Sequence, residues 1–157
     1  MNEIKRGKVK QPRANGRAVS SAALPCPSES AEQRNLFIWA DLQKYAHPEL
    51  QLMYHVPNEG KRTWKNGARL KSEGLRPGVP DIVLPVAKGK YHGLYIELKR
   101  RVKSASRVSD AQKWWITELG VQGYFAKVCY GDEDARAVIV CYLLLKEGEK
   151  MPDVAGG

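Results

Sequence analysis

The chain has 157 residues, 43% of them hydrophobic, and this composition predicts one folded domain rather than a disordered chain. It contains no run of about 18 apolar residues, so no membrane-spanning helix is expected. The basic N-terminus is not followed by the apolar stretch of a secretory signal, and the three cysteines lack metal-ligand spacing, so a protein of the reducing cytoplasm is predicted.

The net charge of +9 is distributed unevenly along the chain. Lysine and arginine gather in residues 1–28, 60–76 and 97–107, whereas the rest of the sequence is acidic. Basic segments on an otherwise acidic chain favour a polyphosphate partner, because its condensed counterions are released on binding. For any one segment, a solvated lysine face is the alternative. Charge alone does not distinguish DNA from RNA or from an anionic membrane.

The first half of the chain is predicted to begin with a mobile basic arm, residues 1–28, which has no apolar periodicity. Ser28 or Ser30 is a suitable N-cap for the first helix, and Pro48 stops that helix. The elements that follow the arm are a helix that continues to Tyr45, a strand over residues 52–56 and a strongly basic helix over residues 61–73.

The second half is predicted to contain a hairpin, two helices and a further strand. In order, these are strands over residues 81–86 and 92–99, a helix from Ser109 to Gly120, a strand over residues 123–129 and a helix that opens at Asp132 or Asp134. The order α-β-α-β-β-α-β-α predicts an α/β fold in which helices flank a mixed central sheet. This domain is expected to span residues 29–147, and a flexible tail to occupy residues 148–157.

The hairpin permits a geometric prediction about Asp81 and Glu97. Facing residues of an antiparallel pair have a constant sum of residue numbers, and this pair is centred on Gly89, where a turn is expected in any case. Asp81 and Glu97 should therefore face each other across neighbouring strands. Side chains alternate along a strand, so Lys99 projects from the same face as Glu97, and the opposite face is apolar.

Two facing carboxylates repel each other, so a positive charge is needed to compensate them. Lys99 is one candidate for that charge, and a bound metal is the other. Oxygen ligands without histidine or thiolate partners suit Mg²⁺ or Mn²⁺, which activate water and polarise a phosphodiester bond. For an isolated spacing of this kind, a surface salt-bridge cluster is the alternative.

A longer series of motifs surrounds these three residues. It comprises NEGKR at residues 58–62, KSEGLRPGVPD at 71–81, GLYIELK at 93–99, SDAQ at 109–112 and Gly123-Tyr124. Over residues 32–145 the chain resembles the PD-(D/E)xK nuclease superfamily, and within it the VRR-NUC branch of replication and repair nucleases. The family often has glycine where Glu59 stands, so the turn at residues 58–60 departs from its pattern.

The resemblance implies a restriction-endonuclease-like core and a divalent-metal-dependent DNA endonuclease that hydrolyses phosphodiester bonds. Small stand-alone members of phage type are similar, which implies a homodimer that acts on branched DNA, like a Holliday-junction resolvase, in replication, repair or recombination. It also implies a place near the nucleoid of a bacterial or phage-infected cell. A non-catalytic DNA-binding module with the same fold is the alternative, and an RNA- or anion-binding protein is a third reading.

The resemblance also assigns roles to individual residues. The implied catalytic set is Asp81, Glu97, Lys99, Glu32 and Gln112, and the implied metal ligands are Glu32, Asp81, Glu97 and the main-chain carbonyl of Leu98. For Glu32 the alternative is an ordinary first-turn glutamate that interacts with the helix dipole. For Gln112 the alternative is a residue on the helix surface.

Basic side chains near the motifs are expected to contact DNA phosphates. These side chains are Lys61, Arg62, Lys65, Arg69, Arg100, Arg101 and Lys103. Trp64 is a candidate for stacking on an unpaired base, although it can equally pack on the domain. Trp114 and Trp115 are neighbours on one helix, so one is expected in the core and the other exposed, where it would suit a dimer interface.

Overall fold

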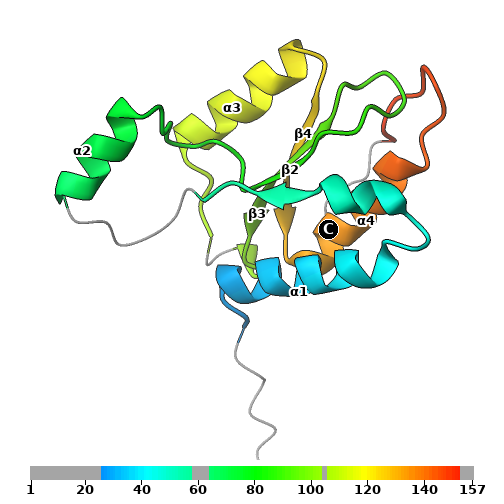
Figure 1. Cartoon of the computed structure of the whole chain (residues 1–157), viewed down its shortest axis with the longest axis horizontal. Coiled ribbons are helices and arrows are strands. Elements are labelled where there is room, and N and C mark those ends of the chain that lie inside the picture. The colour runs from blue at the N-terminus through cyan, green and yellow to red at the C-terminus, as the bar shows by residue number, and fades with distance from the viewer. Residues whose placement is uncertain (1–25, 58–63, 104–105, 153–157) are drawn as a thin grey trace, which may run out of the picture.

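The computed structural model of the protein describes residues 26–57, 64–103 and 106–152, with the backbone alone for residues 64–67. The elements are α1 (Glu29–Gln43), the 3-10 helix η1 (Pro48–Leu52), β1 (Tyr54–His55), α2 (Trp64–Ser72), β2 (Ile82–Leu84), β3 (Leu94–Lys99), α3 (Asp110–Val121), β4 (Phe125–Tyr130) and α4 (Asp132–Leu143). Their order confirms the predicted α/β fold (Figure 1).

The sheet has the strand order β1-β2-β3-β4 and is mixed, as predicted. Strands β1, β2 and β3 pair antiparallel, whereas β4 runs parallel to β3. The hairpin pairs Ile82 with Ile96 and Leu84 with Leu94, so the predicted register is confirmed. Gly89 adopts a positive φ of 58° in the turn that joins the two strands.

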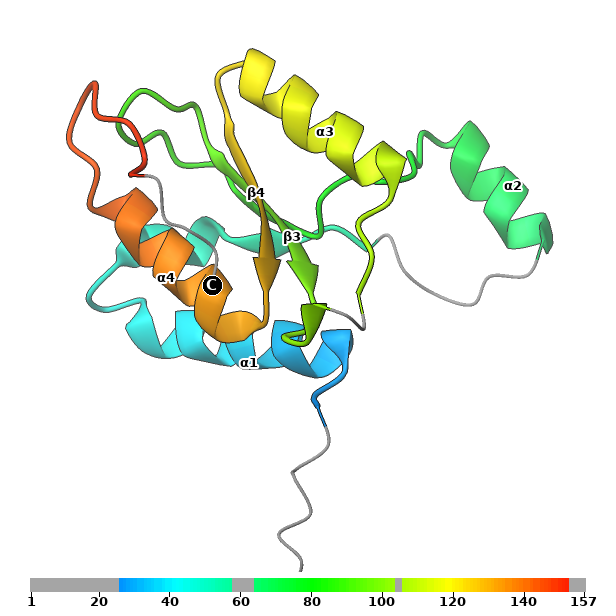
Figure 2. The same ribbon diagram turned by 180° about the vertical axis from the view of Figure 1, so that it is seen from behind.

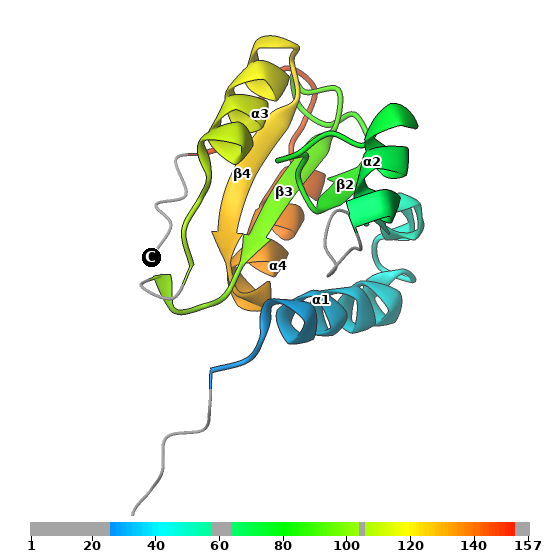
Figure 3. The ribbon, with the colours of Figure 1, turned by 90° about the vertical axis from the view of Figure 1, so that its left-hand side faces the viewer.

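Two helices cover one face of the sheet, and a third covers the other (Figure 3). Leu94, Ile96 and Leu98 project from β3 into a core that also contains Leu36 of α1 and Tyr142 of α4. Helix α3 packs against β4 on the opposite face. The apolar face of β3 therefore stabilises the fold, and its other face is left for the polar residues of the hairpin.

Helix α1 lies across the carboxyl ends of β3 and β4, whereas α2 stands apart from the rest of the domain (Figures 1 and 2). Serine N-caps begin both helices that border the hairpin site. Ser28 accepts a hydrogen bond from the N–H of Ala31 in α1, and Ser109 forms a capping box with Gln112 in α3. No helix in the described ranges is long and apolar enough to cross a membrane.

Some boundaries differ from the predicted ones. Residues 52–56 were expected to form one strand, but Pro48 begins the 3-10 helix η1, which leaves only two residues for β1. The expected tail from residue 148 is instead tied to the domain as far as Met151. Met151 is buried in the core, and the N–H of Lys90 donates to the carbonyl of Glu149 at 3.0 Å. At the other end, the structure describes the chain from Cys26, and residues 1–25 of the predicted arm lie outside the described residues.

Candidate active site

Asp81 is held between two strands at the start of β2. Its Oδ2 accepts a hydrogen bond from the N–H of Leu98 at 2.9 Å, and its carbonyl accepts one from the N–H of Val56 at 2.8 Å. The residue is 6% exposed. Since the N–H and C=O of one strand residue point to the same side, the carbonyl of Leu98 also lies on the side of Asp81.

Glu97 is a buried carboxylate whose two oxygens have different surroundings. Its Oε1 accepts hydrogen bonds from the Lys99 ammonium at 2.7 Å and from the Gln112 amide. Its Oε2 is also buried and has no hydrogen-bond partner among the described residues. Burial, with the negative charge of Asp81 acting in the same direction, raises the pKa of Glu97 to about 8.

Lys99 is enclosed by carboxylates at the carboxyl end of β3. Burial alone would lower its pKa, but the hydrogen bond and the charge of Glu97 outweigh burial and raise it. The Nζ atom also lies 3.8 Å from Oε1 of Glu29, in the first turn of α1. Glu29 is a residue that the sequence reasoning missed. The only signal was that the first turn of α1 contains two glutamates, Glu29 and Glu32.

Gln112 reaches Glu97 because its own capping contact with Ser109 and the packing of the preceding loop fix the start of α3. Its side-chain carbonyl accepts the N–H of Ser109 at 2.8 Å, which leaves the amide nitrogen for Glu97.

The loop before Asp81 contacts the start of α3 at two points. The indole of Trp115 donates to the carbonyl of Pro77 at 3.0 Å. Gly78 has a φ of 80° and lies so close to α3 that a Cβ there would be 2.7 Å from the backbone of Ala111. The loop before Asp81 therefore holds α3 in place.

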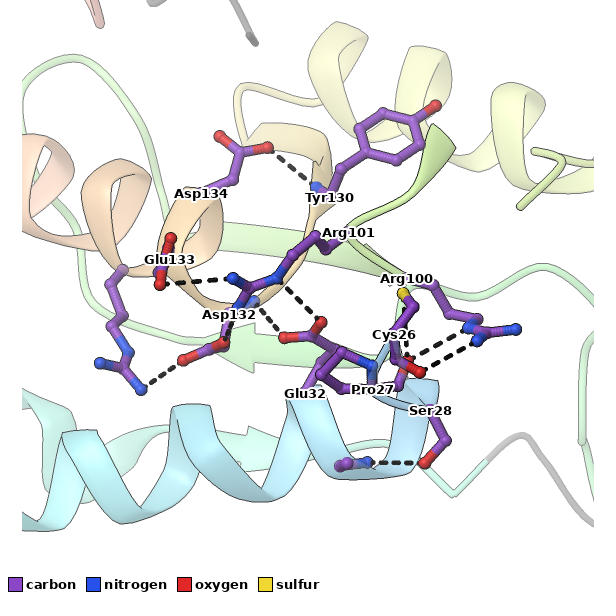
Figure 4. Close-up of polar contacts among 12 residues, drawn as sticks. Cys26, Pro27, Ser28, Glu32, Arg100, Arg101, Tyr130, Asp132, Glu133 and Asp134 are labelled. Carbon is purple, nitrogen blue, oxygen red and sulfur yellow. Dashed lines mark hydrogen bonds and ion pairs between the residues drawn. The ribbon is translucent and has the colours of Figure 1, made fainter. Parts of the chain in front are cut away.

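Glu32 points into a different cluster from the one that was expected (Figure 4). It is fully buried, and its Oε2 accepts the N–H of Asp132 at 3.1 Å. Its Oε1 lies 3.4 Å from Nε of Arg101. Burial would raise the pKa of Glu32, but the bonds from Asp132 and Arg101 outweigh burial and lower it. Of the two first-turn glutamates, Glu29 is the one that reaches Lys99.

The residues expected to contact DNA divide into three groups. Arg100 and Arg101 have partners within the domain: Arg100 donates to the carbonyls of Cys26 and Pro27, both at 3.2 Å, and Arg101 contacts three carboxylates. Arg69 and Lys103 are exposed; Arg69 pairs with Glu73 at 2.9 Å, and Lys103 lies over the ring of Tyr130. Lys61 and Arg62, and the side chains of Trp64 and Lys65, lie outside the described part of the chain.

The paired tryptophans of α3 differ in exposure, but neither lies in the core, where one of them was expected. Trp115 is half-buried and anchors α3 through its bond to Pro77, whereas Trp114 is 57% exposed. Their rings contact each other edge to face, with centroids 5.4 Å apart. Trp114 therefore contacts its neighbour while more than half of the residue remains exposed to solvent.

Comparison with known proteins identifies the family. The model of the VRR-NUC domain matches residues 24–133, a segment that contains the hairpin, Gln112 and all four strands. A solved structure of a VRR_NUC domain protein is 31% identical to the chain and superposes with a TM-score of 0.67, covering 77% of this chain and 92% of its own. No curated protein matches the chain. The extent of the match and the shared fold show that the chain belongs to the VRR-NUC family of nuclease domains.

Proposed function

We propose that the chain is a divalent-metal-dependent DNA endonuclease that hydrolyses phosphodiester bonds at the site of Asp81, Glu97 and Lys99. One observation carries the proposal: Glu97 buries a carboxylate oxygen without a hydrogen-bond partner among the described residues, beside a second carboxylate. Such an arrangement is unfavourable for folding alone, because a buried unpaired acceptor and a like-charge neighbour both cost stability. A cation bound between the carboxylates would offset both effects.

The donor atoms fit Mg²⁺ or Mn²⁺. Within the described segments, no three His, Cys, Asp or Glu side chains are grouped so that they could hold a metal ion together. A cation would therefore depend on the carboxylates of Asp81 and Glu97, the main-chain carbonyl of Leu98 and water. An all-oxygen set of few protein ligands is typical of Mg²⁺, which keeps several of its waters. Glu32, which is bound to Arg101 and Asp132, is not part of this proposed ligand set.

A cation held by Asp81 and Glu97 would supply Lewis-acid chemistry: it would polarise the scissile phosphate and lower the pKa of the attacking water. The protein supplies the rest of the chemistry. Gln112 and Lys99 hold Glu97 in one orientation. The Lys99 ammonium offsets the negative charge that develops on the phosphate. Because this ammonium is largely buried, its interaction with the phosphate is screened little by solvent.

The substrate proposed for this site is branched DNA, cut in replication, repair or recombination by a homodimer. The basic composition of α2, which stands apart from the domain, supports a long phosphate-binding surface beside the site (Figure 2). Trp114 offers an exposed aromatic surface for a second subunit or for a base. Two sites at a fixed distance suit paired cuts across a junction.

The test is a cleavage panel with labelled plasmid, forked DNA and four-way junctions in Mg²⁺, Mn²⁺ or EDTA. We expect metal-dependent cleavage, no cleavage with Asp81→Asn or Glu97→Gln, and a loss of roughly 100-fold or more with Lys99→Met at unchanged DNA affinity. Lys88→Met is the control, because Lys88 pairs with Glu49 at the far end of the hairpin. Cleavage that persists in EDTA contradicts the proposal. DNA binding without cleavage in any metal indicates a non-catalytic binding module instead.

A further inference from the structure

Arg101 lies two residues after the proposed catalytic lysine, and its guanidinium is surrounded by carboxylates. Each nitrogen of its guanidinium faces a different carboxylate: Nε faces Glu32 at 3.4 Å, Nη2 faces Asp132 at 3.2 Å and Nη1 faces Glu133 at 3.5 Å (Figure 4). Glu32 and Asp132 are buried, whereas Arg101 is about half exposed. The guanidinium therefore lies over a buried acidic cluster and compensates its charge together with Arg136, which pairs with the other oxygen of Asp132.

This cluster joins three segments that are distant in the sequence. Glu32 lies in α1, Arg101 lies in the segment directly after β3, and Asp132 is the first residue of α4. The second oxygen of Glu32 accepts the N–H of Asp132, so α1 is bound to α4 as well as to Arg101. Arg100 adds a further tie, because it donates to the two carbonyls of Cys26 and Pro27, just before α1. The start of α1 is thus fixed to the end of β3.

Glu29 lies at this fixed end of α1. It precedes Glu32 by three residues, so the two side chains are neighbours on the helix surface. Glu29 lies 3.8 Å from the Lys99 ammonium, and Lys99 precedes Arg101 by two residues in the sequence. A shift of the first turn of α1 would therefore change the distance between Glu29 and Lys99.

We propose that Arg101 is a positioning residue of the nuclease site: by clamping Glu32 and Asp132 it holds the first turn of α1, so that Glu29 and Glu97 keep the Lys99 ammonium between them. This inference rests on the function proposed above. A lysine at position 101 would not serve, because one ammonium cannot reach three carboxylates in the way that a planar guanidinium does.

The competing role for Arg101 is a direct contact with a DNA phosphate. The two roles predict different measurements. Removal of a phosphate contact weakens DNA binding and reduces its salt dependence, and lysine largely replaces arginine there. Removal of the clamp lowers kcat, leaves KM for DNA and the salt dependence unchanged, and is not repaired by lysine.

The experiment is a double-mutant cycle on kcat, with Arg101→Gln, Arg101→Lys, Glu29→Ala and the double variant Glu29→Ala/Arg101→Gln. We expect both single changes at Arg101 to lower kcat roughly tenfold or more, as is usual for residues that orient a catalytic group. In the Glu29→Ala background, Arg101→Gln should have little further effect, because the group through which Arg101 acts is already gone. Effects that multiply would show that Arg101 does not act through Glu29 and would overturn the inference.

Two measurements separate this inference from simple destabilisation and from failure of the proposed function. Lys88→Met breaks another partly buried ion pair, with Glu49 at 2.9 Å, and is expected to lower the melting temperature without changing kcat. The NMR signal of the Lys99 side-chain ammonium reports its surroundings whether or not the protein cleaves DNA. That signal should change in the same way with Arg101→Gln as with Glu29→Ala, and stay unchanged with Lys88→Met. An unchanged signal with Arg101→Gln contradicts the clamp even if the wild-type protein proves to be a nuclease.

Discussion

At the scale of single residues, the surroundings of Glu97 lower the stability of the fold but suit the proposed chemistry. Its carboxyl group is buried on a strand whose other face is core, beside Asp81, and one of its oxygens lacks a partner among the described residues. Lys99 and Gln112 both bind the other oxygen. The pKa of about 8 follows from this burial and from the neighbouring negative charge. In the absence of metal, folding therefore favours the protonated form of Glu97 more than the unfolded chain does.

This proton makes the stability of the metal-free protein depend on pH. Between the ordinary pKa of 4.5 and the raised value of about 8, the folded state binds a proton that the unfolded chain has released, so the free energy of unfolding should fall as pH rises through this window. Glu97→Gln mimics the protonated form, and its stability relative to wild type should therefore increase from pH 5 to about pH 9. Urea denaturation of both proteins in EDTA measures the difference; a difference independent of pH would contradict the assignment.

Gly78 provides a second prediction, because α3 approaches its Cα closely. Gly74 and Gly78 both have positive φ, 102° and 80°, so alanine is strained at either position by about 1–2 kcal/mol. At Gly78 a Cβ would also meet the backbone of Ala111 and Gln112 at 2.7–2.8 Å, whereas at Gly74 it would meet nothing within 4 Å. Gly78→Ala should therefore destabilise the protein by roughly 1–3 kcal/mol more than Gly74→Ala and displace Gln112 from Glu97. Thermal melts and cleavage rates compare the two variants; equal destabilisation in both would show that close packing on α3 is unimportant.

At the scale of elements, the hairpin was predictable and the role of α1 was not. The register of β2 and β3 follows from the alternation of side chains and from the turn at Gly89, both of which are local. The choice between Glu29 and Glu32 depends instead on how α1 docks. In the docked helix Glu32 binds Arg101 and Asp132, which lie 69 and 100 residues further along the chain. No local pattern contains this information, because both glutamates occupy the first turn of the same helix.

The prediction about DNA binding concerns helix α2. Its basic side chains are proposed to bind phosphates outside the catalytic centre, so Lys65→Ala and Arg69→Ala should each weaken DNA binding and reduce the slope of log K against log salt by about 1. Cleavage at saturating DNA should be retained. Lys146→Ala removes the same charge from the exposed segment after α4, on the other side of the domain from α2, and should change neither quantity (Figure 1). If Arg69→Ala and Lys146→Ala weakened DNA binding equally, α2 would contribute only through the overall charge of the protein.

At the scale of the whole molecule, the C-terminal segment closes the core at the tip of the hairpin. A polar, glycine-containing end of the sequence was expected to be flexible from residue 148, because composition does not reveal a single apolar anchor. Met151 is that anchor: it is 8% exposed, and its N–H donates to the hydroxyl of Tyr91 at 3.2 Å. Gly148 and Glu149 add backbone hydrogen bonds to the turn at Gly89 and Lys90.

Truncation tests this packing directly. Removal of residues 148–157 should lower the free energy of unfolding by about 2 kcal/mol or more, the value of burying a methionine together with the backbone hydrogen bonds of the segment. Removal of residues 153–157 alone should have little effect, because Met151 and its neighbours are retained. Urea denaturation of the two truncated proteins beside the full chain makes the comparison, and equal stability of all three would mean that the segment does not contribute to the core.

The packing of this segment on the hairpin tip also limits how the family can vary in length. A Cβ at Gly89 would overlap the carbonyl oxygen of Glu149, so the turn has no room for a larger residue or an added one while the segment stays in place. Insertion of one residue within β2 or β3 would turn the side chain of Asp81 or Glu97 to the opposite face of the sheet, so that the two would no longer face each other. Insertions and deletions in relatives should therefore occur at the tip together with compensating changes near residues 146–152. In evolutionary terms, the two segments should vary in length as a pair.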